Sequence, residues 1–263
     1  STLPNFIVMA ASDEAELVKM INTSVDINDK PSAIRYPRGT GVGLDLPSID
    51  EKIEITIEPN IINVTKSVAK SKLTLIDIPI GLSSKNINRN IDFKLRKLLP
   101  KGKKSSVFTP PCRNAVYAPD YLTAKKINIT ETLKSISIQS WNISNKIKEV
   151  DEFLVVNNDY NLHEAHPEFC FLNLNNNIPI TDSKKTKEGI KKRIKILNNH
   201  IKNCEDVLEN SYQKYCHKKI KKDDILDAMS LAVSAMYWKK NNKRKITQLP
   251  KKDEKGIALE IYY

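Results

Sequence analysis

A short acidic stretch followed by a long apolar run, residues 223 to 238, constrains the fold of this chain most strongly. It begins Asp-Asp-Ile-Leu-Asp-Ala, and Asp224 and Asp227 are three positions apart, so a helix would place both carboxylates on one face. The small and apolar residues that follow predict a largely buried helix. Carboxylates at the start of such a helix need a positive partner. That partner is either a divalent cation or the helix N-terminus, and this stretch taken alone favours the N-terminal cap.

The charge of the chain is compatible with a nucleic-acid partner but does not establish one. The 263 residues carry a net charge of +12, and the isoelectric point is about 9.3. A basic surface attracts polyanions. Lys, Ile and Asn are all plentiful, however, as they are when an AT-rich genome biases codon usage. A nucleic-acid partner is therefore one of two interpretations of the charge.

Cysteine usage and hydropathy indicate a reduced, cytoplasmic protein. The four cysteines form no C-x-x-C pair, which fits free thiols better than a disulfide framework. No apolar run approaches the roughly 20 residues of a membrane span, and no secretory signal is visible. We therefore expect a cytoplasmic location and no membrane partner, and the pattern leaves the oligomeric state open.

The first 50 residues predict a strand–helix–strand unit of the kind found in parallel sheets. Within them, LPN at 3–5, MAxSDExEL at 9–17 and RYPRGxG at 35–41 resemble the end of the transketolase-like pyrimidine-binding domain of 1-deoxy-D-xylulose-5-phosphate synthase. The resemblance implies that Arg35 and Arg38 are candidates for contacting a substrate phosphate. The catalytic glutamate region and the diphosphate- and magnesium-binding domain of that family are absent. We therefore do not expect this fragment to bind thiamine diphosphate.

Two further segments bring carboxylates to the ends of predicted strands. An apolar strand at residues 73–76 leads into Asp77, and a Pro and a Gly then turn the chain away. Such an Asp either ligates a metal or starts a turn. Residues 163–168, HEAHPE, follow another predicted strand and combine two carboxylates with two imidazoles. H-x-x-H without further paired ligands is a weak signal for zinc, so Glu164 is favoured as a hard-metal ligand or as support for one.

The remaining pattern predicts helices and one last strand. Residues 89–99 favour a basic amphipathic helix, residues 187–212 one long helix with an apolar stripe, and residues 255–263 a strand. The basic residues at 191–195, Arg193 among them, are expected to face solvent, with phosphate contact as the alternative.

Six motifs occur in the order of a known family. They are DIPIGL at 77–82, SVFxxPxR at 106–113, QxWNIxxKIxEVD at 139–151, ExHPExCF at 164–171, SKKTxxGIxxR at 183–193 and DDILDA at 223–228. Together they resemble the domain-of-unknown-function family 429, whose members are predicted nucleases of the RNase H-like, RuvC-like class. The resemblance spans residues 56 to 263 approximately. It implies an α/β fold in which helices flank a mixed sheet.

The resemblance also implies an acidic metal site. In RNase H-like nucleases two strands give carboxylates and a C-terminal helix adds one or two more, often as D-x-x-D. Asp77, Asp224 and Asp227 match the later strand and the helix, and they are the implied ligands of Mg²⁺ or Mn²⁺, which activate water at a phosphodiester. Further residues are implied to join or orient this site: Glu164 as a fourth catalytic carboxylate, and Glu168, Asp223 and His166 beside the ligands.

One part of the family pattern is missing. Such domains begin with a strand that carries a Gly-x-Asp motif, which supplies the first carboxylate. Gly43-Leu44-Asp45 is similar but lies within the synthase-like segment, and only 32 positions separate Asp45 from Asp77, which is short for two further strands and a helix. We therefore predict a chimera. It consists of a synthase-like fragment at 1–50, a junction at 51–58 and an RNase H-like domain at 59–263 without its usual first strand.

These observations lead to three candidate functions. The leading one is a metal-dependent nuclease or phosphodiesterase that is truncated at its N-terminus, so that activity is an open question. The alternatives are a fragment of the thiamine-dependent synthase of the isoprenoid precursor pathway, and a non-catalytic basic module that binds nucleic acid without metal. DNA and RNA are both candidate substrates.

Overall fold

The computed structural model describes residues 7–10, 32–35, 55–68, 73–218, 220–240 and 244–263, with only the backbone described at 7–10, 32–35 and 239–240. The chain divides into two compact units, Ser1–Glu54 and Ile55–Tyr263. In the first, β1 (Ile7–Ala10) and β2 (Ser32–Arg35) pair in parallel, where the sequence predicts two strands. The helix predicted between them lies outside the described residues.

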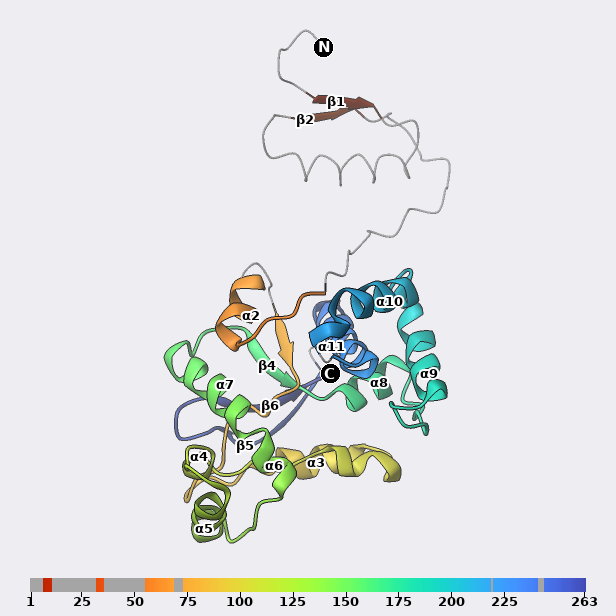
Figure 1. The fold of residues 1–263 in the computed structure, drawn as a ribbon. Helices are drawn as coiled ribbons and strands as arrows, with labels where there is room; N and C mark the ends of the chain where they lie inside the picture. Colours follow the sequence, from red (N-terminus) through yellow and green to blue (C-terminus); the bar gives the residue numbers. More distant parts are fainter. Residues whose placement is uncertain (1–6, 11–31, 36–54, 69–72, 219, 241–243) are drawn as a thin grey trace. The chain divides into compact units, whose positions relative to one another are not determined.

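The larger unit is built on a four-stranded mixed sheet with the order β3-β4-β6-β5 (Figure 1). β3 (Thr74–Ile76) is parallel to β4 (Leu162–Ala165), and β4 is parallel to β6 (Ala258–Tyr262). β5 (Lys245–Lys252) runs antiparallel to β6. A mixed sheet flanked by helices is the architecture expected from the sequence. β3 and β6 lie where apolar runs predict strands.

The helices of the larger unit attach to this sheet through separate apolar clusters. In chain order the helical segments are α2 (Ile61–Ser67), α3 (Ile91–Leu98), the 3₁₀ helix η1 (Lys101–Ser106), α4 (Arg113–Val116), α5 (Tyr121–Thr132), α6 (Ile138–Asn142), α7 (Ser144–Val156), α8 (Pro167–Leu174), α9 (Lys187–Asn198), α10 (Cys204–Tyr215), η2 (Cys216–Lys218) and α11 (Lys222–Lys240). One cluster joins α2 and α7 to β4 through Ile61, Val150 and Leu162. Another joins α3 and α8 to β6 through Leu95, Phe169 and Ile261.

The apolar run after the acidic stretch forms the buried helix that its composition predicts. α11 contacts α8, α9, α10 and β3. Its buried apolar residues are Ile225, Leu226, Met229, Leu231 and Val233. These contacts fix the N-terminal turn of α11 beside β3, which places its acidic residues near the carboxyl end of that strand. None of the helices in the described part of the chain is long and apolar enough to cross a membrane.

The prediction of one long helix over residues 187–212 is wrong. α9 ends at Asn198, and α10 begins at Cys204 after Asn203, whose φ of 54° is left-handed and interrupts an α-helix. The prediction that Arg193 faces solvent is also wrong, because this side chain is completely buried. It donates a hydrogen bond to Glu168, which supplies the negative partner that a buried guanidinium requires.

Candidate functional site

A cavity of about 340 Å³ is lined by residues at the ends of β3 and β4. Because these strands are parallel, their carboxyl ends lie at the same edge of the sheet, where open α/β sheets usually bind ligands. Asp77 follows β3, Glu164 lies in β4 and His166 follows β4; α11 contributes Asp227, and the loop before α9 contributes Lys184. The other lining residues are Ile78, Pro79, Asp92, Leu95, Ser106, Val107, Phe108, Ile143, Ala165, Pro167 and Glu168.

The position of Lys184 follows from the close packing of its loop against α9. Gly189 has no side chain, and a Cβ at this position would overlap the carbonyl oxygen of Ser183. The hydroxyl of Thr186 caps the helix by accepting a hydrogen bond from the amide of Gly189 at 3.1 Å. The SKKTxxG motif therefore specifies the turn that brings Lys184 to the cavity.

Lys184 joins two carboxylates of α11 at one side of the cavity. Its Nζ lies 2.5 Å from Asp227 Oδ2 and 3.8 Å from Asp223 Oδ2. The second oxygen of Asp227, Oδ1, is buried and has no hydrogen-bond partner among the described residues. Burial raises the pKa of Asp227, while the hydrogen bond and charge of Lys184 oppose that shift. Asp227 Oδ1 is therefore a buried hydrogen-bond acceptor that no described residue uses.

The charges of Asp227 and Lys184 both affect the pKa of Asp77. The side chain is solvent-accessible, but the surrounding walls limit its hydration. This loss of hydration, and secondarily the charge of Asp227, raise the pKa of Asp77 to about 7; Lys184 acts in the opposite direction. A carboxylate pair of this kind, from a strand end and a neighbouring helix, is one that a further positive charge would stabilise. We call Asp77, Lys184, Asp223 and Asp227 the acidic group.

The structure distributes the three aspartates of α11 differently from the sequence prediction. Asp223 and Asp227, four residues apart, share the buried face next to Lys184. Asp224 is exposed, and its Oδ2 accepts a hydrogen bond from the amide of Lys221 at 3.1 Å. The residue that caps the helix is therefore not one of the residues that lie next to Lys184. Asp224 caps the helix, and Asp223, predicted only as a supporting residue, lies with Asp227.

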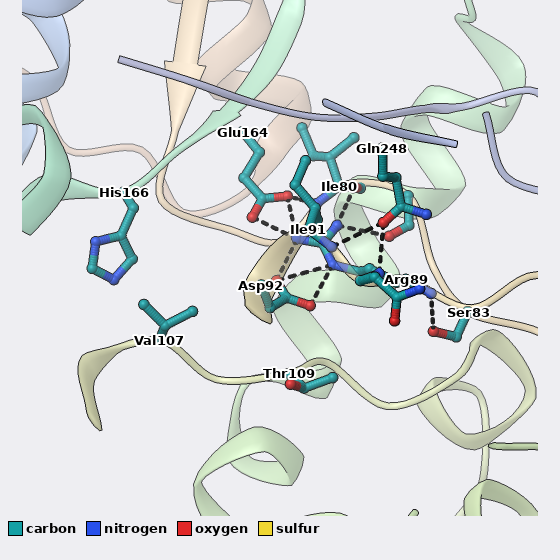
Figure 2. Close-up of polar contacts among 12 residues, drawn as sticks. Ile80, Ser83, Arg89, Ile91, Asp92, Val107, Thr109, Glu164, His166 and Gln248 are labelled. Atoms are coloured by element: carbon teal, nitrogen blue, oxygen red, sulfur yellow. Dashed lines mark hydrogen bonds and ion pairs between the residues drawn. The ribbon is translucent and has the colours of Figure 1, made fainter. Parts of the chain in front are cut away.

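A second ionic group is centred on Arg89 (Figure 2), and its two carboxylates, Asp92 and Glu164, line the cavity. The guanidinium donates to both oxygens of Asp92 at 2.8–3.1 Å and to both oxygens of Glu164 at 2.7 and 2.9 Å. Its remaining nitrogen, Nη1, donates to the carbonyl oxygens of Ile80 and Gly81. All three nitrogens are therefore used. We call Arg89, Asp92 and Glu164 the arginine group.

Glu164 accepts hydrogen bonds on both of its carboxylate oxygens. Besides Arg89, the amide of Ile80 donates to Glu164 Oε2 at 2.7 Å. Burial raises the pKa of Glu164 to about 7, against the charge of Arg89. Burial by itself would lower the pKa of the Arg89 guanidinium. The charges of Asp92 and Glu164 and their hydrogen bonds outweigh that effect and raise this pKa above its ordinary value. The structure thus places Glu164 in the cavity wall as the partner of Arg89.

Arg89 and Asp92 are not predicted as site residues from the sequence. The available signal was their i, i+3 spacing at the start of a predicted helix, which is common on solvated helix faces. The burial of the pair depends on β5, where Gln248 Oε1 accepts hydrogen bonds from the amides of Asn90 and Ile91 at 2.6 and 2.9 Å (Figure 2). Such a contact across the fold has no local sequence signature.

Glu168 is also paired with buried or partly buried cations. Its Oε1 accepts a hydrogen bond from Arg193 Nη2 at 2.6 Å, and its Oε2 lies 3.5 Å from Lys103 Nζ. Lys103 also donates to the carbonyl oxygen of Asp182 at 3.0 Å. Glu168 therefore connects η1, α8 and α9 beside the cavity.

His166 has one ring nitrogen engaged and one available. Nε2 lies 3.4 Å from Ser106 Oγ and 3.3 Å from the Ser106 carbonyl oxygen, whereas Nδ1 is buried without a hydrogen-bond partner among the described residues. Burial lowers the pKa of His166, so its ring is neutral near pH 7. His163, in contrast, stacks on Tyr262 with the ring centres 4.2 Å apart.

No complete metal cluster is present in the described part of the chain, where no three or more His, Cys, Asp or Glu side chains gather in a way that could hold an ion. Among the implied ligands, the structure brings Asp77 and Asp227 to one cavity and leaves Asp224 outside. Arg38 lies outside the described residues, and the side chain of Arg35 is not described.

Comparison with known proteins gives one result for family and one for structure. No solved structure matches the chain significantly. The family model described as "Protein of unknown function (DUF429)" matches residues 37–255. The match begins before the predicted junction, so it includes Gly43-Leu44-Asp45. Since the match covers most of the chain and all six internal motifs, this protein belongs to the DUF429 family.

Proposed function

We propose that the cavity binds one divalent cation, Mg²⁺ or Mn²⁺, between Asp77 and Asp227 and hydrolyses phosphodiester bonds in nucleic acid. The observation that carries this proposal is the pair itself. Two carboxylates from different elements line one cavity, the charge of Asp227 raises the pKa of Asp77, and Asp227 Oδ1 has no partner among the described residues. Three carboxylates next to the single ammonium of Lys184 favour a further cation.

The residues fit such an ion by their chemistry. Mg²⁺ prefers oxygen ligands and is commonly held by only one or two carboxylates, with water and substrate phosphate completing its shell. Asp77 and Asp227 supply two carboxylates, and Asp227 Oδ1 is available. When bound, a divalent cation lowers the pKa of a coordinated water and polarises a phosphate oxygen.

The protein's own side chains would perform the other tasks. Lys184 lies beside Asp227 and supplies a positive charge for a substrate phosphate. His166 has a ring nitrogen, Nδ1, to which no described residue hydrogen-bonds, and burial favours the neutral ring, so His166 is able to hold or transfer a proton within the cavity. The buried arginine group keeps the wall between β4 and α3 rigid while these groups act.

The RNase H-like mechanism that the family resemblance implies uses a further carboxylate, which the sequence pattern assigns to a Gly-x-Asp motif. The family match begins at residue 37 and includes Asp45 in such a pattern, and Asp45 lies outside the described residues. Asp45→Asn tests the predicted chimera: hydrolysis should be unchanged if the first strand of the family was lost at the junction, and a loss of hydrolysis would contradict that prediction.

The proposal is tested by measuring hydrolysis of DNA and RNA with Mg²⁺ or Mn²⁺ in wild type, Asp77→Asn and Asp227→Asn. Loss of a ligand should lower the rate by about 100-fold or more, since metal stabilisation of the transition state is worth several kcal/mol. Asp224→Asn is the matched control on the same helix and should keep the wild-type rate. Hydrolysis that persists in Asp227→Asn, or that does not depend on metal, would contradict the proposal.

A further inference from the structure

The cavity has walls of two different kinds. Lys184, Asp227 and Glu168 bring charge from α8, α11 and the loop before α9. Apolar lining comes from Leu95 in α3, Val107 and Phe108 after η1, Ile143 before α7, and Ile78 and Pro79 after β3. The end of β3 and α3 also contribute the carboxylates of Asp77 and Asp92. A ligand that satisfies both kinds of wall must combine an ionic group with a flat or apolar group.

Two polar atoms at the cavity lack partners, and both indicate a ligand with polar edges. Asp227 Oδ1 and His166 Nδ1 are buried without hydrogen bonds among the described residues. Buried polar atoms in folded proteins are nearly always paired, by protein, by water or by a ligand. A nucleobase edge, a ribose hydroxyl and a hydrated cation are groups that would pair with them.

The apolar wall also carries an exposed aromatic ring. Phe108 lines the cavity yet is 39 % exposed, while its neighbour Val107 is 5 % exposed. An accessible aromatic ring beside a charged group is the arrangement on which unpaired bases stack. Two exposed basic residues precede it in the chain, Lys101 and Lys104 of η1. Lysines near a ring on which bases stack can contact the phosphates of a bound nucleic-acid strand.

The size of the cavity limits what enters. About 340 Å³ is near the lower end of small-molecule sites, which span roughly 300–1,000 Å³. A single nucleotide is of that order, whereas a base pair within a duplex is stacked and keeps its faces covered. Only an unpaired nucleotide therefore presents both a phosphate and an open base face to this cavity.

We propose that the cavity takes one unpaired nucleotide of a single-stranded nucleic acid. The base lies against Phe108 and Val107, the phosphate lies toward Lys184, and the strand continues over Lys101 and Lys104 of η1. This deepens the proposed function by naming its substrate class, and it rests on the same cavity. Binding does not require hydrolysis, so the two proposals can fail separately.

The test is the affinity of the full chain for fluorescently labelled oligonucleotides, measured by anisotropy in EDTA so that no metal chemistry takes part. The probes are one sequence as a single strand of DNA, as a single strand of RNA and as a duplex, with a free nucleoside monophosphate as competitor. Single strands should bind at least about tenfold more tightly than the duplex, because base–aromatic stacking contributes only when the base is unpaired. The monophosphate should compete weakly, since it lacks the neighbouring phosphates.

Phe108→Ala should lower single-strand affinity about tenfold and leave duplex affinity unchanged. Phe93→Ala is the matched control, because Phe93 is an exposed phenylalanine of α3 that does not line the cavity. Circular dichroism spectra like those of wild type would show that both variants fold. Equal affinity for single strands and duplex, or equal losses in the two variants, would overturn the inference.

Metal-dependent hydrolysis that proceeds equally on duplex and single strand would remove this inference while leaving the proposed function intact. Single-strand binding that depends on Phe108, without hydrolysis, would do the reverse.

Discussion

Two ionic groups line the same cavity, and they differ in whether their charges are satisfied. In the arginine group, every guanidinium nitrogen donates, and Glu164 accepts from both Arg89 and a backbone amide. In the acidic group, Lys184 faces two carboxylates of α11, a third carboxylate is nearby, and Asp227 Oδ1 has no partner within the described part of the chain. Both groups have an excess of carboxylates over cations.

The difference separates a structural role from a binding role. A buried arginine with a complete set of acceptors resists rearrangement, because any motion leaves a charge unpaired. An incomplete set of partners next to a cavity is one that a ligand can complete. Because both groups combine carboxylates with one basic side chain, their residue types alone do not distinguish the structural group from the binding group. Four predictions test the separation, in order of decreasing expected effect.

Arg89→Met should destabilise the fold by about 3–5 kcal/mol, because Glu164 and Asp92 would be left buried without their cation. The free energy of unfolding from urea titration measures this. Lys85→Met is the control, because Lys85 lies in the same loop and is exposed. A loss below about 1 kcal/mol would show that the arginine group is not the structural one.

Lys184→Gln should change binding more than stability. The side chain is 35 % exposed, so the ion pair with Asp227 is partly screened and its loss should cost only about 1 kcal/mol. Removing the competing ammonium should raise Mn²⁺ affinity by about tenfold, on the scale of about 1.4 kcal/mol for nearby charges. Isothermal titration calorimetry measures the affinity.

The neighbouring Lys185 is exposed and provides the control Lys185→Gln for the Lys184 experiment. If both variants bind Mn²⁺ as wild type does, Lys184 and the cation do not share Asp227.

The pH dependence of stability should reveal the raised pKa of Asp77. Its folded-state pKa is about 7, against an ordinary value of 3.8. Well below pH 3.8 the carboxyl is protonated in both folded and unfolded chains. Between about pH 4 and pH 7 the unfolded chain has given up the proton while the folded chain still holds it, so stability is lost across this window. Above about pH 7 the carboxyl is ionised in both states and the loss is constant.

Asp77→Asn should therefore gain stability relative to wild type between about pH 5 and pH 8, by less than the preceding effects because the group is solvent-accessible. Urea midpoints at the two pH values measure the difference. Burial likewise raises the pKa of Glu164, which remains in the variant and gives the same slope to both proteins. Parallel pH profiles would contradict the raised pKa.

Asp224→Asn should have the smallest effect. Its carboxylate accepts one hydrogen bond at the exposed start of α11, and Asn caps helices nearly as well as Asp. We expect a loss of stability below about 0.5 kcal/mol by thermal unfolding, and unchanged metal affinity. A large drop in metal affinity would contradict this expectation, because it would show that Asp224 binds the metal together with the acidic group.

The elements of the fold were largely predictable because they depend on local pattern. The apolar run after Asp227 predicts a buried helix, and α11 is one. The strand leading to Asp77 and the C-terminal strand are present as β3 and β6. The long helix over 187–212 failed because its apolar stripe continues across Asn203, where the backbone turns left-handed.

The candidate site was predictable in part. Asp77 and Asp227 were identified from strand-end and helix-start positions, and the structure brings them to one cavity. Asp224 was chosen over Asp223 because a D-x-x-D spacing is compatible with one helix face. Which of two faces is buried depends on the direction from which β3 and α9 approach, and the spacing carries no information about that.

The sequence by itself determined the family, the mixed α/β class and the acidic character of the α11 start, because these follow from motif order and from periodicity. Only the tertiary structure decided that Glu164 is neutralised by Arg89, that Arg193 is buried on Glu168, and that Lys184 meets Asp227. The partners in these pairs are 75, 25 and 43 positions apart. Charge pairing over such separations is set by how the elements pack, so no local pattern encodes it.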